Sequence, residues 1–326
     1  MGIRREPAFI LFGEGIDFYS WRGAKWFILT FFGAFLAAAI LAPIIYAWIQ
    51  SMQPADPDSI VAYLQSKPIS RYVDRVRLLF AAISLVWLIG ACRLWGRFGF
   101  WWSRKGGKSL FGYLLLGILS LGLVVVSQYL LLEIEAKREA GFGKVAEIIM
   151  AALLGGLLIG WLEEAIFRGM VLRMFYTAVK PGKAILLSAL VFAAVHFKSV
   201  PDSLDNSYHW YSSFIVAGYQ SISVFLYVEW IDFANLFLVG IVLNLVFLRT
   251  GSLVGCMGLH AGWVLVRNTW TKLVDIPESS ATQFWGTERI VDGYASLIIL
   301  SAIAVALYVE LRKHQKQGQV GLGKLA

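Results

Sequence analysis

The stretch that decides the fold is GWLEEAIFRGM, residues 160–170, in which two adjacent glutamates and an arginine interrupt a long apolar run. The run begins near Val145 and carries almost no other polar side chain before Glu163. A charge at the middle of a membrane-spanning helix costs about 2.5–3.5 kcal/mol on insertion scales, so it persists where it has a partner or a function. Glu163, Glu164 and Arg168 are therefore the first candidates for functional residues.

The composition around this stretch is that of a polytopic membrane protein. The chain has 326 residues, of which 58% are hydrophobic and 15% charged, whereas soluble proteins are about half apolar and a quarter charged. The net charge is +8, but the Lys and Arg residues gather between apolar runs, which indicates membrane topology and not nucleic-acid binding. Cys92 and Cys256 both lie in apolar runs and predict neither a disulfide framework nor a metal site.

The apolar runs predict an all-α fold with about eight membrane-spanning helices, because a spanning helix needs about 20 apolar residues. The predicted spans are 26–49, 78–95, 110–132, 145–167, 184–198, 233–248, 253–270 and 294–311. We expect no cleavable signal peptide, because the first run is too long for one. With the N-terminus inside, most Lys and Arg residues lie on the cytoplasmic side, which predicts that both termini are cytoplasmic. A ninth span at 211–230 would place the acidic loop 271–293 inside, so we interpret 211–230 as interfacial or re-entrant.

Two further spans carry histidines that join the glutamates as candidates. The segment FAAVHF places Phe192 and His196 four residues apart, and GCMGLHAGW places His260 between two glycines that imply close helix packing. Glu164 precedes Arg168 by four residues, the favourable order for an ion pair on a helix. Glu163 is turned by about 100° from Glu164 and has no such local partner. Either these residues converge in one site, or each faces a separate helix contact.

The order and spacing of these motifs resemble the CPBP family, which contains CAAX-protease and bacteriocin-processing intramembrane endopeptidases. EEAIFR matches the EExxxR motif and FAAVH the FxxxH motif, and FLVGIVLNLVFLRTGSLVGCMGLHAG, residues 237–262, is similar to the third and fourth motifs. The resemblance covers about 145–270 and implies a protease core of four helices. We therefore divide the chain into three N-terminal spans (1–144), this core (145–270), and an external loop, last span and cytoplasmic tail (271–326).

The resemblance also implies the chemical roles of the candidates. Glu163 would be the general base that takes a proton from water, and His196 would orient that water or protonate the leaving amine. His260 would donate a hydrogen bond to the oxyanion. Glu164 would pair with Arg168 and fix the end of the helix.

Two positions depart from the family pattern. Val264 stands where the family usually has Asn or Asp, four residues after the histidine, and Asn244 stands where a second glycine is frequent. Phe192, from the FxxxH motif, and Asn244, from the third motif, are expected to support the site. His260 would have to serve the oxyanion without the usual second donor.

The function predicted is that of an intramembrane endopeptidase without a cofactor, acting on a membrane protein or lipidated peptide in the bilayer, most simply in the plasma (inner) membrane. One alternative is a zinc peptidase with Glu163, His196 and His260 as ligands, because one carboxylate and two imidazoles suffice for a catalytic zinc. The other is a non-catalytic scaffold or a protein of the bacteriocin-immunity type. We expect no nucleic-acid partner.

Overall fold

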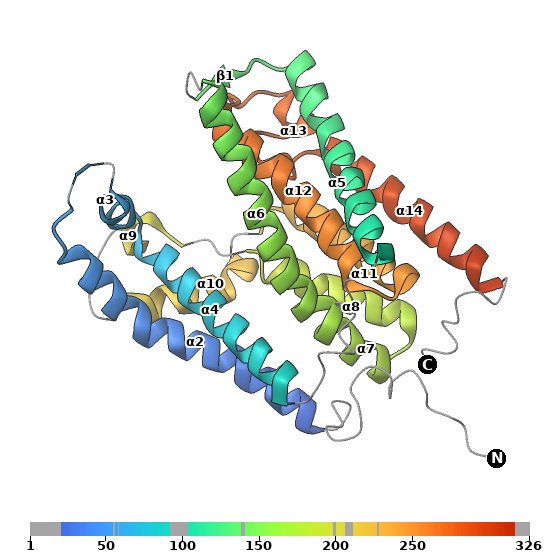
Figure 1. Cartoon of the computed structure of the whole chain (residues 1–326), viewed down its shortest axis with the longest axis horizontal. Helices are drawn as coiled ribbons and strands as arrows, with labels where there is room; N and C mark the ends of the chain where they lie inside the picture. The colour runs from blue at the N-terminus through green and yellow to red at the C-terminus, as the bar shows by residue number, and fades with distance from the viewer. Residues whose placement is uncertain are drawn as a thin grey trace. The chain divides into compact units, whose positions relative to one another are not determined.

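A computed structural model of the chain describes residues 21–54, 56–57, 59–91, 104–137, 141–197, 200–205, 211–226 and 228–316. These residues are mostly helical (Figure 1). The helices are α2 (Trp21–Gln50), α3 (Ile60–Gln65), α4 (Ile69–Ala91), α5 (Arg104–Leu131), α6 (Phe142–Ile166), the π-helical turn η1 (Phe167–Val171), α7 (Leu172–Ala178), α8 (Pro181–Ala194), α9 (Asp202–Asp205), α10 (Ser212–Leu226), α11 (Trp230–Thr250), α12 (Leu253–Leu273), α13 (Thr282–Trp285) and α14 (Tyr294–Lys316). The strands β1 (Glu135–Ala136) and β2 (Val274–Asp275) pair antiparallel, with Glu135 opposite Asp275.

The predicted fold class, an all-α polytopic membrane protein, is confirmed. Five helices of the described residues are long and apolar enough to cross a membrane: Phe32–Gln50, Gly106–Leu131, Phe142–Tyr176, Trp230–Thr250 and Tyr294–Lys313. Helices α4, α8 and α12 fall outside this set, and the count of eight spans stays a prediction. Helix α8 has 14 residues, about 21 Å at 1.5 Å per residue, which is shorter than the hydrocarbon core of about 30 Å.

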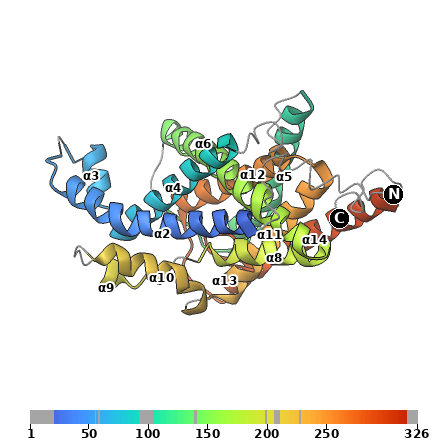
Figure 2. The same cartoon turned by 90° about the horizontal axis from the view of Figure 1, so that it is seen from below.

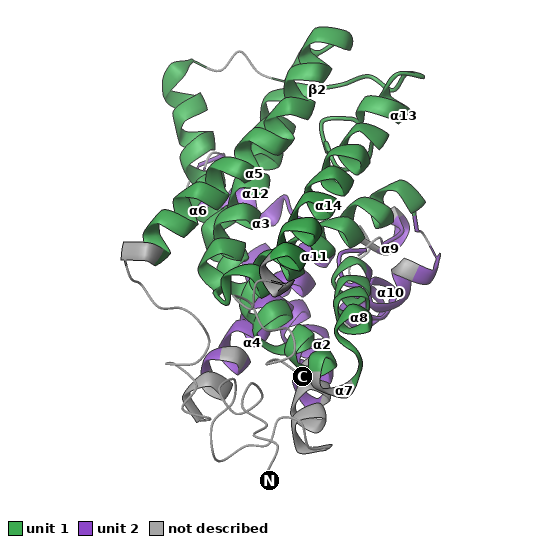
Figure 3. Ribbon diagram, turned by 90° about the vertical axis from the view of Figure 1, so that its right-hand side faces the viewer, with its two compact units in different colours: residues 1–14, 93–193, 229–326 green, residues 15–92, 194–228 purple. Residues whose placement is uncertain are grey.

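The described chain forms two compact units, shown in different colours in Figure 3. The first unit comprises 1–14, 93–193 and 229–326, and the second comprises 15–92 and 194–228. This division differs from the one drawn on the sequence, because α5 packs with the later helices and α10 packs with α2 and α4. Within the second unit, α10 runs beside α2, and α3 lies at the end of the α2–α4 hairpin (Figure 2).

Helix α12 is the centre of the first unit and packs along both α5 and α6 (Figure 1). Glycines allow this approach. A Cβ atom on Gly258 would lie 2.3 Å from the Leu110 carbonyl oxygen of α5, and one on Gly262 would lie 2.4 Å from that of Leu114. On the other side, Gly156 and Gly160 face α12, whereas Gly155 faces open space. The backbones of these helices therefore contact one another directly, as small residues permit inside membranes.

We expect Gly258→Ala to lower the free energy of unfolding by about 1–3 kcal/mol, because the added methyl group forces α12 and α5 apart. The matched control is Gly122→Ala in α5, where an added Cβ would meet nothing within 4 Å. Unfolding of both purified variants in detergent micelles measures the difference. Equal loss of stability in the two variants would contradict the close packing of α12 on α5.

The turn between α11 and α12 is set by two residues of the LRTGSL segment. Gly251 follows the last residue of α11 with φ 63°, and its N–H donates to the Phe247 carbonyl. A left-handed residue after a helix is most easily a glycine. Ser252 is the N-cap of α12, and its side chain accepts a hydrogen bond from the Val254 N–H. The two helices therefore follow one another with almost no linker, which fixes the position of His260 relative to α11.

At one end of the first unit, a buried glutamine joins α5 to the segment after β2. Gln128 Nε2 donates to the carbonyl oxygens of Trp285, Gly286 and Thr287, and its Oε1 accepts from Trp270 Nε1. Because every polar atom of this amide is satisfied, its burial costs little. The contacts hold the segment that carries α13 against the end of the bundle.

Candidate active site

The two glutamates of the EEAIFR stretch lie in the last turn of α6. Helix α6 ends at Ile166 and continues into the π-helical turn η1 and then α7. A π turn inserts one extra residue into the helical ladder and is frequent at functional sites. Arg168 lies in this turn and is fully buried.

The predicted pair of Glu164 with Arg168 is present. Arg168 Nη1 donates to Glu164 Oε1 at 3.1 Å, and both side chains are 0% exposed. Arg168 Nη2 donates to the Gly240 carbonyl of α11 at 3.2 Å. Its guanidinium group also lies 4.7 Å from the centroid of the Phe192 ring, a cation–π distance. Arg168 therefore joins the end of α6 to α11 and α8 as well as neutralising Glu164.

His260 reaches both glutamates from α12. Its Nδ1 atom lies 2.8 Å from Glu164 Oε1, and its Nε2 atom lies 3.9 Å from Glu163 Oε2. A carboxylate accepts only, so Nδ1 carries the proton in its bond to Glu164. The ring is thereby fixed, and Nε2 faces Glu163.

Two glycines of α6 set the register that makes this contact. A Cβ atom on Gly160 would lie 3.3 Å from the Met257 carbonyl oxygen and 3.6 Å from His260 Cβ. One on Gly156 would lie 3.1 Å from the Ala261 carbonyl oxygen and 3.3 Å from Val264 Cβ. Val264 therefore packs against the α6 backbone one turn away from His260, where the family usually has a polar side chain.

The two supporting residues have different surroundings. Phe192 packs edge-on against Phe167, with centroids 4.9 Å apart, and its centroid lies 6.3 Å from that of His260. Phe192 is thus part of the wall around the charged cluster. Asn244 Nδ2 donates to the Ile185 carbonyl at 3.0 Å, so this amide joins α11 to α8. No hydrogen bond from Asn244 to the cluster occurs in the described part of the chain.

His196 does not lie on a helix face as the sequence predicted. Helix α8 ends at Ala194, and His196 follows in a turn whose Phe197 N–H donates to the Ala194 carbonyl. His196 belongs to the second unit, whereas Glu163 and His260 belong to the first. The convergence of His196 with the other two stays a prediction.

The zinc alternative has two of its three ligands in the first unit. The Glu163 and His260 atoms that face each other are 3.9 Å apart, and Nδ1 of His260 is engaged by Glu164. Within the described residues, no group of three or more His, Cys, Asp or Glu side chains is arranged to hold a metal ion. A zinc site would thus depend on His196 joining this pair.

The bond between His260 and Glu164 was not predicted from the sequence. The only signal for it was the glycine spacing on α6 and α12, which indicates close packing but not which side chains meet. Because of this bond, Glu164 is the residue to which both Arg168 and His260 are attached, through the same oxygen Oε1.

We expect Glu164→Gln to lower the free energy of unfolding by about 3–5 kcal/mol, because it leaves Arg168 buried without a counter-charge. The control is Glu147→Gln on the same helix, which breaks only an exposed pair with Lys144 and is worth about 1 kcal/mol or less. Thermal unfolding of the purified variants measures both effects. We expect Glu164→Gln combined with Arg168→Gln to recover part of the loss, and no recovery would contradict the pairing.

Comparison with known proteins identifies a domain around this cluster. Residues 145–266 match the family of Type II CAAX prenyl endopeptidase Rce1-like proteins. The matched segment is less than half of the 326 residues and includes Glu163, Glu164, Arg168 and both motif histidines. No curated protein and no solved structure matches the chain. The match indicates a CAAX-type intramembrane peptidase, which acts on substrates at or in the bilayer.

Proposed function

Residues 145–266 belong to the CAAX-protease (CPBP) family, and from this premise we propose that the protein is an intramembrane endopeptidase that uses Glu163 to activate water. The observation that carries the proposal is the contrast between the two glutamates. Glu164 is 0% exposed and bound to Arg168 and His260, whereas the Glu163 side chain is 21% exposed beside His260 Nε2. Glu163 is therefore the glutamate of the pair whose side chain is partly open, whereas Glu164 is enclosed.

The charges of the cluster support this division of roles. Glu163 and Glu164 carry two negative charges, and Arg168 with a protonated His260 carries two positive ones. A neutral total is favourable because an unbalanced charge in a low-dielectric site is costly. In the proposal, His260 is doubly protonated, with Nδ1–H held by Glu164 and Nε2–H free to donate.

The reaction follows from these positions. Glu163 takes a proton from water, and the resulting hydroxide attacks the carbonyl carbon of the scissile peptide bond. The oxygen of that carbonyl becomes negative and accepts the Nε2–H bond of His260. The C–N bond then breaks, and the leaving amine takes a proton, either from Glu163 or from His196. The Val264 side chain has no hydrogen-bond donor, so in the proposal His260 alone among these two side chains of α12 donates to the oxyanion.

The substrate that we propose for the enzyme is a membrane protein or a lipidated peptide. A prenylated C-terminal tail, a lipoprotein, a C-terminal anchor and a bacteriocin leader all fit a site of this kind. The test begins in cells that carry Glu163→Gln, where proteins that accumulate uncut are identified by mass spectrometry. The purified enzyme must then cleave one of them, with and without a strong chelator. Cleavage that is lost on chelation and restored by zinc would replace the proposal with the zinc peptidase.

We propose that the protein lies in the plasma (inner) membrane, with both termini in the cytoplasm. We expect a reporter fused after Ala326 to be active in the form that reads the cytoplasm, because Lys and Arg concentrate on the same side as the tail. A second reporter that is active only outside the cytoplasm, fused at the same position, is expected to be inactive. An external result would require an odd number of spans and would make 211–230 a span.

A further inference from the structure

A pocket of about 440 Å³ lies in the second unit, at the end of the α2–α4 hairpin. Its size falls within the range of about 300–1,000 Å³ that is usual for ligand clefts. Helices α2, α3 and α4 and the short connection before α4 supply the residues that line it. The pocket therefore belongs wholly to one compact unit and is independent of the charged cluster around Glu163.

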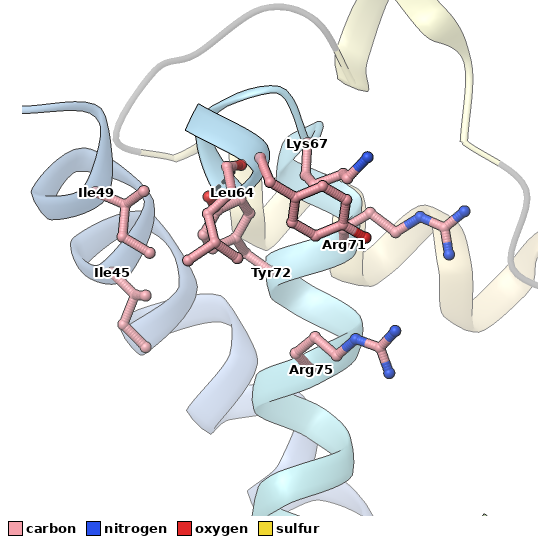
Figure 4. A pocket seen from close by; sticks show the side chains of 8 residues that line it. Ile45, Ile49, Leu64, Lys67, Arg71, Tyr72 and Arg75 are labelled. Carbon is pink, nitrogen blue, oxygen red and sulfur yellow. Dashed lines mark hydrogen bonds between the residues drawn. The ribbon is translucent and has the colours of Figure 1, made fainter. Parts of the chain in front are cut away.

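One side of the pocket is apolar and lies at the end of a membrane span. Ile45 and Ile49 come from the last turns of α2, whose apolar segment ends at Gln50. Ile45 is 36% exposed, and Leu64 and Tyr72 continue the apolar surface toward α4 (Figure 4). This surface therefore lies where the span leaves the hydrocarbon, at the depth of lipid headgroups and the first carbons of their chains.

The other side of the pocket is cationic. Lys67, Arg71 and Arg75 succeed one another at intervals of four residues, and Arg71 and Arg75 lie one turn apart on α4 (Figure 4). Both arginines are exposed, and the Lys67 amine lies 4.2 Å from the centroid of the Tyr63 ring. The N-terminus of α4 is close by and adds partial positive charge.

These three cations have no carboxylate partner in the part of the chain that the structure describes. Asp74 lies between the two arginines in sequence and interacts electrostatically with Arg77. A row of cations without carboxylate partners among the described residues, beside an apolar wall, fits an anionic ligand. A ligand that fills both sides must be an amphiphile with a negative head.

We infer that this pocket binds an anionic phospholipid of the surrounding membrane, with its phosphodiester at Lys67, Arg71 and Arg75 and an acyl chain along Ile45 and Ile49. Anionic headgroups attract Lys and Arg residues at the membrane surface. The chain leaves the pocket over the exposed side of α2, which carries Leu41 and Ile44 and is already suited to lipid. This inference does not depend on peptidase activity.

The test uses the full-length protein, purified in a nonionic detergent and stripped of lipid. Native mass spectrometry follows binding of phosphatidylglycerol, with phosphatidylcholine as the zwitterionic comparison. We expect the phosphatidylglycerol complex to weaken about 100-fold in the triple variant Lys67→Gln, Arg71→Gln, Arg75→Gln, the size expected when three cations are removed from an anionic lipid. Ile45→Gln is expected to weaken it as well, because the acyl chain loses its contact.

A charge-matched control separates a site from general attraction. The variant Lys144→Gln, Arg312→Gln, Lys313→Gln removes the same charge from other exposed positions, and its binding is expected to stay at the wild-type level. Equal weakening in both triple variants would overturn the inference in favour of non-specific surface charge. Glycerol phosphate without acyl chains is the last arm. If it binds as tightly as the lipid, the pocket is a site for soluble anions and the lipid assignment is wrong.

Discussion

Glu163→Gln is expected to abolish cleavage while the folded protein remains abundant in the membrane. Glutamine keeps the size and hydrogen-bonding capacity of the side chain but cannot take a proton from water at neutral pH. Loss of a general base typically reduces the rate by about 10²–10⁴-fold. Stability is expected to change little, because the buried pair of Glu164 with Arg168 remains. The rate of substrate cleavage by purified protein measures the effect.

Two glutamate variants on the same helix serve as controls for Glu163→Gln. Glu147→Gln removes an exposed carboxylate that pairs with Lys144, and it is expected to leave both activity and stability unchanged. Glu164→Gln is expected to change stability first, and activity through the position of His260. The glutamate mechanism is refuted if Glu163→Gln cleaves at the wild-type rate. It is also refuted if Glu164→Gln is inactive and Glu163→Gln active in proteins of equal stability.

Much of the fold could be predicted because the bilayer leaves few choices to an apolar run. Backbone groups in hydrocarbon must bond within the segment, so a long apolar run predicts a helix. The predicted spans 233–248 and 253–270 also left the turn at Gly251 and Ser252 between them, where the structure has the C-cap of α11 and the N-cap of α12. Composition and the length of the apolar runs therefore predict α2, α5, α6, α11 and α14 from the sequence.

The end of α8 was not readable in the same way. The apolar run continues through His196 to Phe197 and contains neither Gly nor Pro, so the sequence predicts that the helix continues. In the structure, the Phe197 carbonyl accepts a hydrogen bond from Ser223 of α10. A contact between residues far apart in sequence thus satisfies the backbone in place of the next helical turn. Such a tertiary contact leaves no local signal.

The same distinction separates the two halves of the charged cluster. The pair of Glu164 with Arg168 is local, because residues four apart on a helix are neighbours, and the sequence predicted it. The bond between Glu164 and His260 joins α6 to α12, and it depends on the register set by Gly156 and Gly160. The sequence indicates that two glycine-bearing helices approach, but a shift of one turn would place another side chain against Glu164.

The π turn that carries Arg168 is a further feature that no pattern predicted. An α-helix through residues 163–171 would have the same spacing of apolar residues, so periodicity cannot distinguish the two. The consequence is nevertheless local to the site, because η1 lies between the glutamates and α7. In the structure, Arg168 binds Glu164 and the Gly240 carbonyl together, and thereby fixes α6 against α11.

The second large effect is expected for His260→Ala, which removes the proposed donor to the oxyanion. Removing one such donor costs about 10²–10³-fold in rate in other hydrolases, and here Val264 offers no second donor on α12. We expect kcat to fall by at least this factor with little change in KM, because the bond forms only when negative charge develops on the substrate. Steady-state cleavage by the purified variant gives both constants.

A purely structural role for His260 predicts a different pattern, because the ring also bonds Glu164 through Nδ1 at 2.8 Å. If holding Glu164 were its whole contribution, His260→Ala would lose stability together with activity, and Glu164→Gln would reproduce its kinetics. His260→Asn separates the roles further, since its shorter amide keeps a donor near Nδ1 but cannot extend to the position of Nε2. We expect this variant to unfold close to the wild-type temperature and to remain as inactive as the alanine variant. Substantial activity in the asparagine variant would remove His260 from the oxyanion site and leave it as a positioning residue, whereas substantial activity in the alanine variant would exclude both roles.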